Sequence, residues 1–156
     1  MAWTGKRPSA FADTITDAVS RKTRAAAMQA LAGVIERSPV GNPDNWRSVK
    51  EWQRRTGNSG RPPWLSGYIG GTFRGNNRVS VGSPDRGFDV DDQDSTGAAA
   101  LSAGSAVIAS TRGAPFTVIY VQNNLPYARV LEDGSSQQAP QGVFAVTFNS
   151  LVEASR

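Results

Sequence analysis

Apolar residues recur at three- and four-residue spacing from residue 9 to residue 37, in the stretch SAFADTITDAVSRKTRAAAMQALAGVIER. This spacing is typical of an α-helix with one buried face. Ser9 suits the N-cap position, and Ser38 and Pro39 stop the helix after Arg37. The pattern therefore predicts a long helix, roughly 40 Å at about 1.5 Å per residue. Its apolar stripe comprises Phe11, Ile15, Ala18, Val19, Met28, Leu31, Val34 and Ile35.

Two later stretches have the pattern of β-strands. Residues 70–84, GGTFRGNNRVSVGSP, alternate apolar and polar side chains, and residues 83–87 then form a turn signal. Residues 88–90 suit a brief return strand. Residues 115–123, PFTVIYVQN, are β-branched and aromatic nearly throughout, which predicts a strand in the centre of a sheet.

Three further stretches favour helices. Residues 45–55 place Trp46, Val49 and Trp52 on one side. Residues 95–112 are rich in alanine and follow a run of aspartates, with Arg112 and Gly113 suited to the C-terminal end. Residues 142–155 fit either a strand or a helix, and the spacing of Phe144, Phe148, Leu151 and Val152 favours a helix that starts at Pro140.

The order of these elements predicts an α+β fold. We expect a small antiparallel or mixed sheet packed by a long N-terminal helix, a middle helix and a C-terminal helix. The length of 156 residues suits one domain spanning residues 1–156, and the 16 Gly and nine Pro indicate long loops. The longest is residues 40–71, an inserted segment rich in Trp, Arg and Gly, which we call the arm. Residues 72–155 hold the sheet and the remaining helices.

The chain contains no His and no Cys, which limits the catalytic and metal-binding sites that it can form. This absence removes the commonest general base, the commonest metal ligand and every thiolate site. We name no catalytic residue, no cofactor and no metal, and expect the protein not to be an enzyme; a small hydrolase is the disfavoured alternative. No signal peptide and no stretch long enough to span a bilayer are visible, so we expect no membrane partner.

The charged residues of the arm allow two interpretations of its function. The net charge is +4, and the arm combines Arg and Lys with Trp46, Trp52 and Trp64. Such residues stack on bases and contact phosphates, which would suit a basic nucleic-acid-binding module. They also dominate the hot spots of protein interfaces, and we favour protein contact because no known nucleic-acid motif accompanies the charge.

Two other motifs are weaker. The stretch DVDDQDSTG begins like a calcium loop but has no Gly at its sixth position and Ala100 at its twelfth, so we favour helix capping by an acidic, solvated loop. The stretch GYIGG has no Gly-Lys-Ser/Thr after it and precedes a predicted strand, so we reject a phosphate-binding loop. Gly70 and Gly71 instead allow a sharp backbone turn.

Three stretches together resemble a known family. They are SPVGNPDNW after the long helix, GYIGGTFRGNNRVSVG, and VQNNLPYARVLEDGSSQQAPQGVFAVTF. The last is the most specific, with Asn-Asn-x-Pro-Tyr-Ala, Leu-Glu-x-Gly and Ser-x-Gln-Ala-Pro in order. The chain resembles, from about residue 10 to residue 155, the head–tail joining or tail-completion proteins of tailed bacteriophages, also called neck or tail-terminator proteins. It departs from them at Asn77, where many members have Trp, and in a longer segment from Trp46 to Trp64.

The resemblance implies a structural virion protein that is assembled in the host cytoplasm. Such proteins form a ring, usually hexameric, that ends the tail tube and joins it to the head-closure or connector protein, while genomic DNA passes through the channel without sequence-specific binding. A ring needs two different faces on each subunit. We expect the basic arm and the acidic loop to meet across the subunit boundary, with residues 127–131 and Glu132 holding a ring-facing loop in shape. The candidate contact residues are Trp46, Trp52, Arg54, Arg55, Trp64, Arg74, Asp89, Asp91, Asp92, Tyr127 and Glu132.

Overall fold

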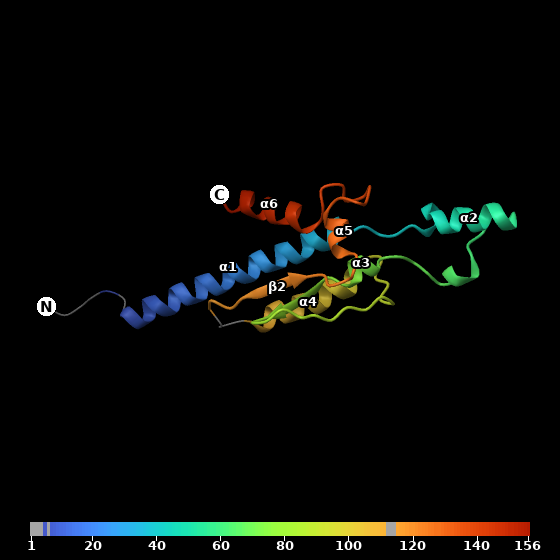
Figure 1. Cartoon of the computed structure of the whole chain (residues 1–156). Helices are drawn as coiled ribbons and strands as arrows, with labels where there is room; N and C mark the ends of the chain where they lie inside the picture. Colours follow the sequence, from blue (N-terminus) through green and yellow to red (C-terminus); the bar gives the residue numbers. More distant parts are fainter. Residues whose placement is uncertain (1–4, 6, 112–114) are drawn as a thin grey trace.

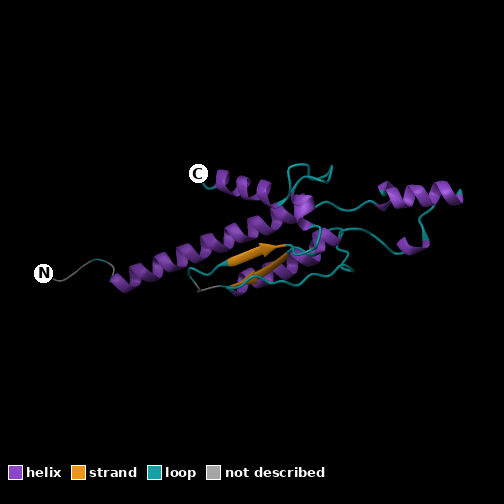
Figure 2. Ribbon diagram, viewed as in Figure 1, coloured by secondary structure: helices purple, strands orange, loops and turns teal. Residues whose placement is uncertain are grey.

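A computed structural model describes residues 5, 7–111 and 115–156 of the chain. This part contains helices and a two-stranded antiparallel sheet, which makes the fold α+β as expected (Figures 1 and 2). The α-helices are α1 (Pro8–Arg37), α2 (Arg47–Thr56), α3 (Thr72–Gly75), α4 (Ala98–Ser110), α5 (Ala128–Glu132) and α6 (Phe144–Ala154). The strands are β1 (Arg78–Val81) and β2 (Ile119–Gln122), and two 3₁₀ turns, η1 (Pro43–Asn45) and η2 (Pro63–Leu65), lie in the arm.

Helix α1 is the long N-terminal helix that the apolar periodicity predicts. Its start was predicted wrongly: the helix begins at Pro8, which suits a first turn, and no side chain caps it. At its other end the Ser38 hydroxyl donates to the Val34 carbonyl at 2.7 Å and the Ser38 N–H donates to the Ile35 carbonyl at 3.2 Å. Ser38 therefore ends the helix at the predicted place.

The core lies along the C-terminal half of α1. Leu31 and Ile35 pack with Ala100 and Ile108 of α4, and Val79, Ile119 and Val121 of the sheet cover this cluster. A second cluster places Val34 against Val143, Phe73 and Leu125, where α6 and the end of β2 meet α1. The N-terminal half of α1 extends beyond both clusters, and Phe11 and Ile15 there are exposed (Figure 1).

The sheet is smaller than predicted. Strands β1 and β2 pair antiparallel with Val79 opposite Val121. Among the described residues no strand pairs with the other edge of β2, so the prediction that it lies in the centre of a sheet is wrong. The strand expected over residues 70–84 begins only at Arg78, because α3 occupies Thr72–Gly75. Residues 88–90 form no return strand. They run in the loop of residues 82–97, which we call the acidic loop.

The ends of the later helices also differ from expectation. Helix α4 begins at Ala98, and the predicted end at Arg112 and Gly113 lies outside the described residues. The C-terminal segment is a helix, as its spacing favours, but α6 begins at Phe144 and not at Pro140. Helix α6 packs on α1 at Gly33, where a Cβ would lie 2.9 Å from the Thr147 methyl.

Candidate assembly surfaces

The arm leaves the other helices and carries α2 to one end of the molecule (Figure 1). Val49 of α2 and Leu65 of η2 are buried there, whereas Trp46, Trp64 and Ile69 of the arm are exposed. The rings of Trp52 and Trp64 meet edge to face at 5.9 Å between centroids. These contacts give the arm a small core of its own, so that α2 has a defined orientation.

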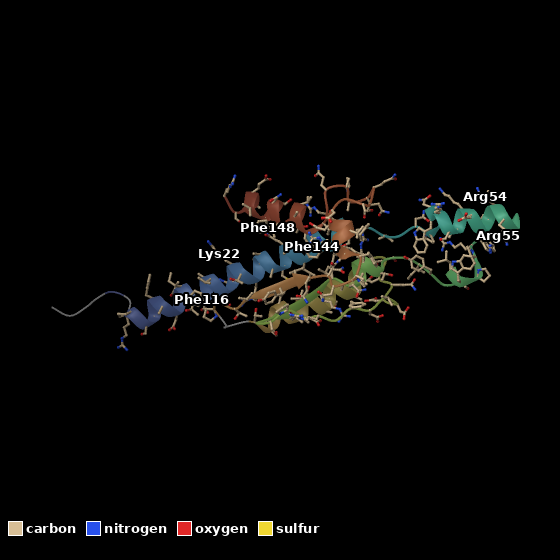
Figure 3. All side chains as sticks on the ribbon, viewed as in Figure 1. Lys22, Arg54, Arg55, Phe116, Phe144 and Phe148 are labelled. Atoms are coloured by element: carbon tan, nitrogen blue, oxygen red, sulfur yellow. The ribbon has the colours of Figure 1, made fainter. Side chains whose placement is uncertain are left out.

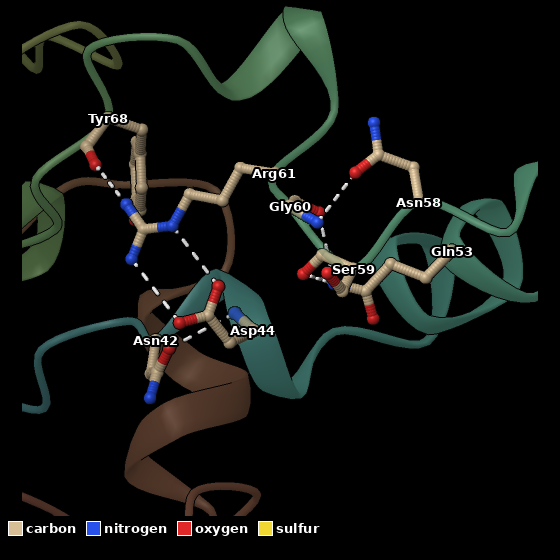
Figure 4. A network of polar contacts seen from close by, with 8 residues as sticks. All are labelled: Asn42, Asp44, Gln53, Asn58, Ser59, Gly60, Arg61 and Tyr68. Carbon is tan, nitrogen blue, oxygen red and sulfur yellow. Dashed lines mark hydrogen bonds and ion pairs between the residues drawn. The ribbon is translucent and has the colours of Figure 1, made fainter.

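Polar contacts fix the rest of the arm (Figure 4). The Arg61 guanidinium donates to Asp44 through Nε at 3.1 Å and to the Tyr68 carbonyl through Nη1 at 3.0 Å. The Gln53 amide donates to the Gly60 carbonyl at 3.1 Å. Arg61 therefore ties the incoming half of the arm to its outgoing half.

Two glutamines hold the base of the arm to the rest of the protein. Gln138 accepts from the Val40 N–H at 3.1 Å and donates to the Val40 carbonyl at 3.0 Å. Gln93, in the acidic loop, accepts from the Ile69 N–H at 2.8 Å. Each chain connection of the arm is thus bound by one glutamine side chain at the point where it leaves the body.

The predicted arm residues differ in their exposure. Trp46 is 39% exposed and packs on the Tyr68 ring, whereas Trp64 is 60% exposed at the far end. Trp52 is half-buried between α2 and η2. Arg54 and Arg55 are both exposed, and Figure 3 labels them on α2 at the end of the arm. The structure therefore brings Trp52 and Trp64 together and leaves the two arginines facing outward.

Arg74 does not belong to this outward surface. Its guanidinium donates to the Ser95 carbonyl through Nη1 and to the Ser38 carbonyl through Nη2, both at 2.8 Å. It therefore joins the end of α1 to the chain that enters α4. The structure gives Arg74 an internal role that its position next to the arm did not predict.

Asparagine side chains hold the acidic loop against the sheet. The buried Asn76 donates to the Asp89 carbonyl at 2.6 Å and accepts from the Asp89 N–H at 2.7 Å. Asn124 donates to the Gly87 carbonyl at 3.0 Å and to the Asp85 carbonyl at 2.8 Å. These side chains replace a strand ladder, which explains why residues 88–90 run beside the sheet without joining it.

Asp94 caps α4, as the acidic run predicts. Its carboxylate accepts from the backbone N–H groups of Gly97, Ala99 and Ala100 at 2.7, 2.8 and 3.1 Å. Burial acts to raise the pKa of Asp94, but the hydrogen bonds from Ala100, Thr96, Gly97 and Ala99 outweigh it and hold that pKa below its ordinary value of 3.8.

The other three predicted aspartates remain on the surface. Asp89 accepts from the Asp91 N–H at 2.9 Å, so part of its carboxylate is used within the loop. Among the described residues, no hydrogen-bond or ion-pair partner reaches the carboxylates of Asp91 and Asp92. The described residues also contain no group of three or more acids that would hold a metal ion.

Glu132 contacts the start of a helix that lies far from it in the sequence. Its carboxylate accepts from the N–H groups of Val143, Phe144 and Ala145 at 2.8, 2.9 and 2.8 Å, which caps the distant helix α6. Burial acts to raise the pKa of Glu132, but these three hydrogen bonds outweigh it and the pKa lies below its ordinary value of 4.5. Glu132 therefore joins the two ends of the loop of residues 133–142, and the ring-facing position of this loop stays a prediction.

Tyr127 and Val130, in the turn of residues 127–131, lie at the surface. Tyr127 is 40% exposed, and Val130 is more exposed still. Ala128 and Leu131 of this turn pack on the core, and the Tyr127 ring lies 6.3 Å from the ring of buried Phe73. Burial, and then the nearby Tyr68, raise the pKa of Tyr127. Tyr127 lines a hollow of about 650 Å³ at the base of the arm, with Trp46 and Tyr68.

Further exposed aromatic side chains were not predicted. Phe116 is 80% exposed before β2, and Phe148 is 65% exposed on α6 (Figure 3). Helical spacing predicts that Phe148 shares a face with Phe144 but does not say whether that face is covered. No described helix is long and apolar enough to cross a membrane.

Comparison of the chain with known protein families, with curated proteins and with solved structures finds no match.

Proposed function

We propose that this protein is a structural component of the neck of a tailed-bacteriophage virion. Copies of the chain form a ring, hexameric in this proposal, that ends the tail tube and joins it to the head-closure or connector complex. Genomic DNA passes through the central channel. The partners are further copies of the chain, the tail tube protein and the head-closure protein. The role is one of assembly, and we propose no catalytic step.

The observation that carries this proposal is the arm. About thirty residues form this segment, which contributes nothing to the main core but presents α2 at one end of the molecule (Figure 1). Trp64, Arg54 and Arg55 are exposed there. An exposed cluster of tryptophan and arginine on a structured projection suits a protein contact. The family resemblance of residues 10–155 agrees with a contact that builds a ring.

The proposal is tested with the purified full-length protein. We expect sedimentation velocity to show a closed oligomer and negative-stain images to show rings with a central hole. Added to tail tubes that lack their terminator, the protein is expected to leave an extra layer of density at the tube end. A chain that stays monomeric at all concentrations and adds nothing to the tubes contradicts the proposal. Class averages also count the subunits, and a number other than six favours an adaptor or a minor tail component.

A second function is favoured by the charge of α2. Four cations on ten residues resemble the footprint of a protein that binds nucleic acid through its backbone phosphates. A basic nucleic-acid-binding module predicts duplex affinity that falls steeply as salt rises. A gel shift with random-sequence duplex separates the two functions, because a ring that only surrounds DNA needs no such affinity.

A further inference from the structure

Helix α2 carries a row of cations on an exposed face. Arg47, Lys50 and Arg54 follow one another at three- and four-residue spacing, which places them on one side of the helix. With Glu51 they line a hollow of about 270 Å³, and Glu51 lies 3.6 Å from Arg54. Arg47, Lys50 and Arg55 have no ion-pair partner among the described residues.

The opposite face of α2 explains why this row has a fixed direction. Val49 is fully buried, and Trp52 packs on Trp64. Gly57, in a left-handed conformation with φ 68°, ends the helix where Arg54 and Arg55 lie in the last turn. A structured helix whose cations all face outward loses little conformational entropy when it docks.

The body offers a groove whose charged lining is two carboxylates, Asp85 and Asp92, and one guanidinium, Arg78. It has a volume of about 340 Å³ and lies between α4, β1 and the acidic loop. Small residues of α4, Ala99, Ala103 and Gly104, form one wall. Gly104 accepts no larger residue, because a Cβ there would lie 2.5 Å from the Leu31 side chain. Asp85 and Asp92 of the acidic loop also line the groove.

The free charge at this groove comes from two of the five aspartates in the loop. Asp94 caps α4, Asp89 accepts within the loop, and Asp85 pairs with Arg78 at 3.6 Å. Asp92 is half-buried beside Gly75, where a Cβ would lie 2.9 Å from its carboxylate, and Asp91 is exposed next to it. A half-buried carboxylate without a partner is stabilised by a cation brought from outside.

We propose that the cationic face of α2 docks into this acidic groove on a second copy of the chain, with Arg54 and Arg55 against Asp91 and Asp92. The two surfaces have complementary charge, because the arm has five cations and two acids, whereas the acidic loop has five acids and one cation. Helix α2 does not dock into the groove of its own chain. Gln138 and Gln93 hold the base of the arm, and α2 projects away from α4 (Figure 1).

This pairing rests on the proposed assembly function and specifies its contact. Because α2 and the groove are different surfaces, each copy uses one to bind a neighbour and leaves the other for the next copy. Such head-to-tail contacts close into a ring when the rotation between copies allows it.

The experiment reverses the charges on each side and then on both. R54E/R55E and D91K/D92K are each expected to weaken self-association by about tenfold or more in sedimentation velocity at about 50 mM NaCl. The chain that carries all four changes is expected to recover association to within about threefold of wild type. The matched control is R21E/K22E, the same change of charge at two exposed positions of α1 (Figure 3). Circular dichroism shows that every variant is folded.

The outcomes separate the pairing from the proposed function. Rings that persist in R54E/R55E, or an association that the four changes do not restore, overturn the pairing and leave the ring intact. Charge-sensitive association without rings in the images supports the pairing and contradicts the neck function. A wild-type chain that stays monomeric contradicts both. Loss of duplex DNA binding in R54E/R55E with unchanged assembly assigns the cationic face to nucleic acid, and this also overturns the pairing.

Discussion

The arm and the body of this protein use polar and charged side chains in opposite ways. In the body, Asn76, Asp94 and Glu132 turn their polar atoms inward, onto backbone groups of neighbouring segments. In the arm, Arg54 and Arg55 are exposed, and among the described residues the only ion pair of either is that of Arg54 with Glu51 of the same helix. Charge that satisfies the chain's own backbone stabilises a fold, whereas charge left at the surface is available to a partner.

This difference has a practical use. Three of the four tryptophans lie in the arm, at positions 46, 52 and 64, and the fourth is Trp3. A chain with Trp3→Phe therefore reports the arm by fluorescence, while far-UV circular dichroism is dominated by α1, α4 and α6. The arm and the body are separate in space. The two signals test whether they also unfold separately.

The largest effect is expected in the body core. Leu31 is fully buried between α4 and the sheet, so Leu31→Ala leaves a cavity and lowers the free energy of unfolding by about 2–5 kcal/mol. Leu101→Ala on the exposed side of α4 is the matched control and costs about 1 kcal/mol or less. Urea unfolding followed by circular dichroism measures both. Equal losses would show that the core is not where the structure places it.

A smaller effect is expected at the cap of α6. Glu132→Gln removes a charge that accepts three backbone N–H groups, and lowers the free energy of unfolding by about 1–3 kcal/mol near pH 7. Glu153→Gln, at the exposed end of α6, is the control.

The difference in stability between wild type and Glu132→Gln is expected to depend on pH. The pKa of Glu132 is lowered in the folded state, so near its ordinary value of 4.5 the unfolded chain binds more protons than the folded one. The stabilisation by this carboxylate is complete above that pH and is lost as pH falls through the lowered folded pKa. Wild type and Glu132→Gln should therefore converge in stability in acid. A constant difference between them down to about pH 2 would refute the cap as its source.

These residues also show what the sequence does and does not reveal. The periodicity in the C-terminal half of α1 follows from burial along one face, whereas the spacing in α6 predicts the helix although Phe148 is exposed. Asp94 lies close enough to α4 in sequence to be recognised as its cap. Glu132 caps a helix that begins twelve residues later, so no local pattern connects the two. Asn76 replaces a strand ladder with its side chain. The surface role of Asp91 and Asp92 was predicted only as part of an undivided acidic run.

A comparable loss, confined to one loop, is expected at Asn76. Asn76→Ala leaves the Asp89 N–H and carbonyl without their partner, which costs about 1–2 kcal/mol. Hydrogen exchange of the Asp89 amide should speed up by at least about tenfold, because the contact that protects it is gone. Asn149→Ala, exposed on α6, should change neither quantity by a comparable amount. Unchanged exchange at Asp89 would show that the loop is held by other contacts.

The smallest effect on the body is expected from a cavity in the arm. Val49 is as fully buried as Leu31, yet its neighbours belong to the arm, which meets the body chiefly through two extended connections and the glutamines at its base. Val49→Ala in the Trp3→Phe chain should shift the tryptophan emission to longer wavelength, because Trp52 and Trp64 lose their packing. The unfolding of the body, followed by circular dichroism, should change by less than about 0.5 kcal/mol. Val130→Ala, at an exposed position of α5, should leave both signals unchanged. If fluorescence and circular dichroism instead shift together, the arm and the body unfold as one unit, and a docking arm that acts independently of the fold is ruled out.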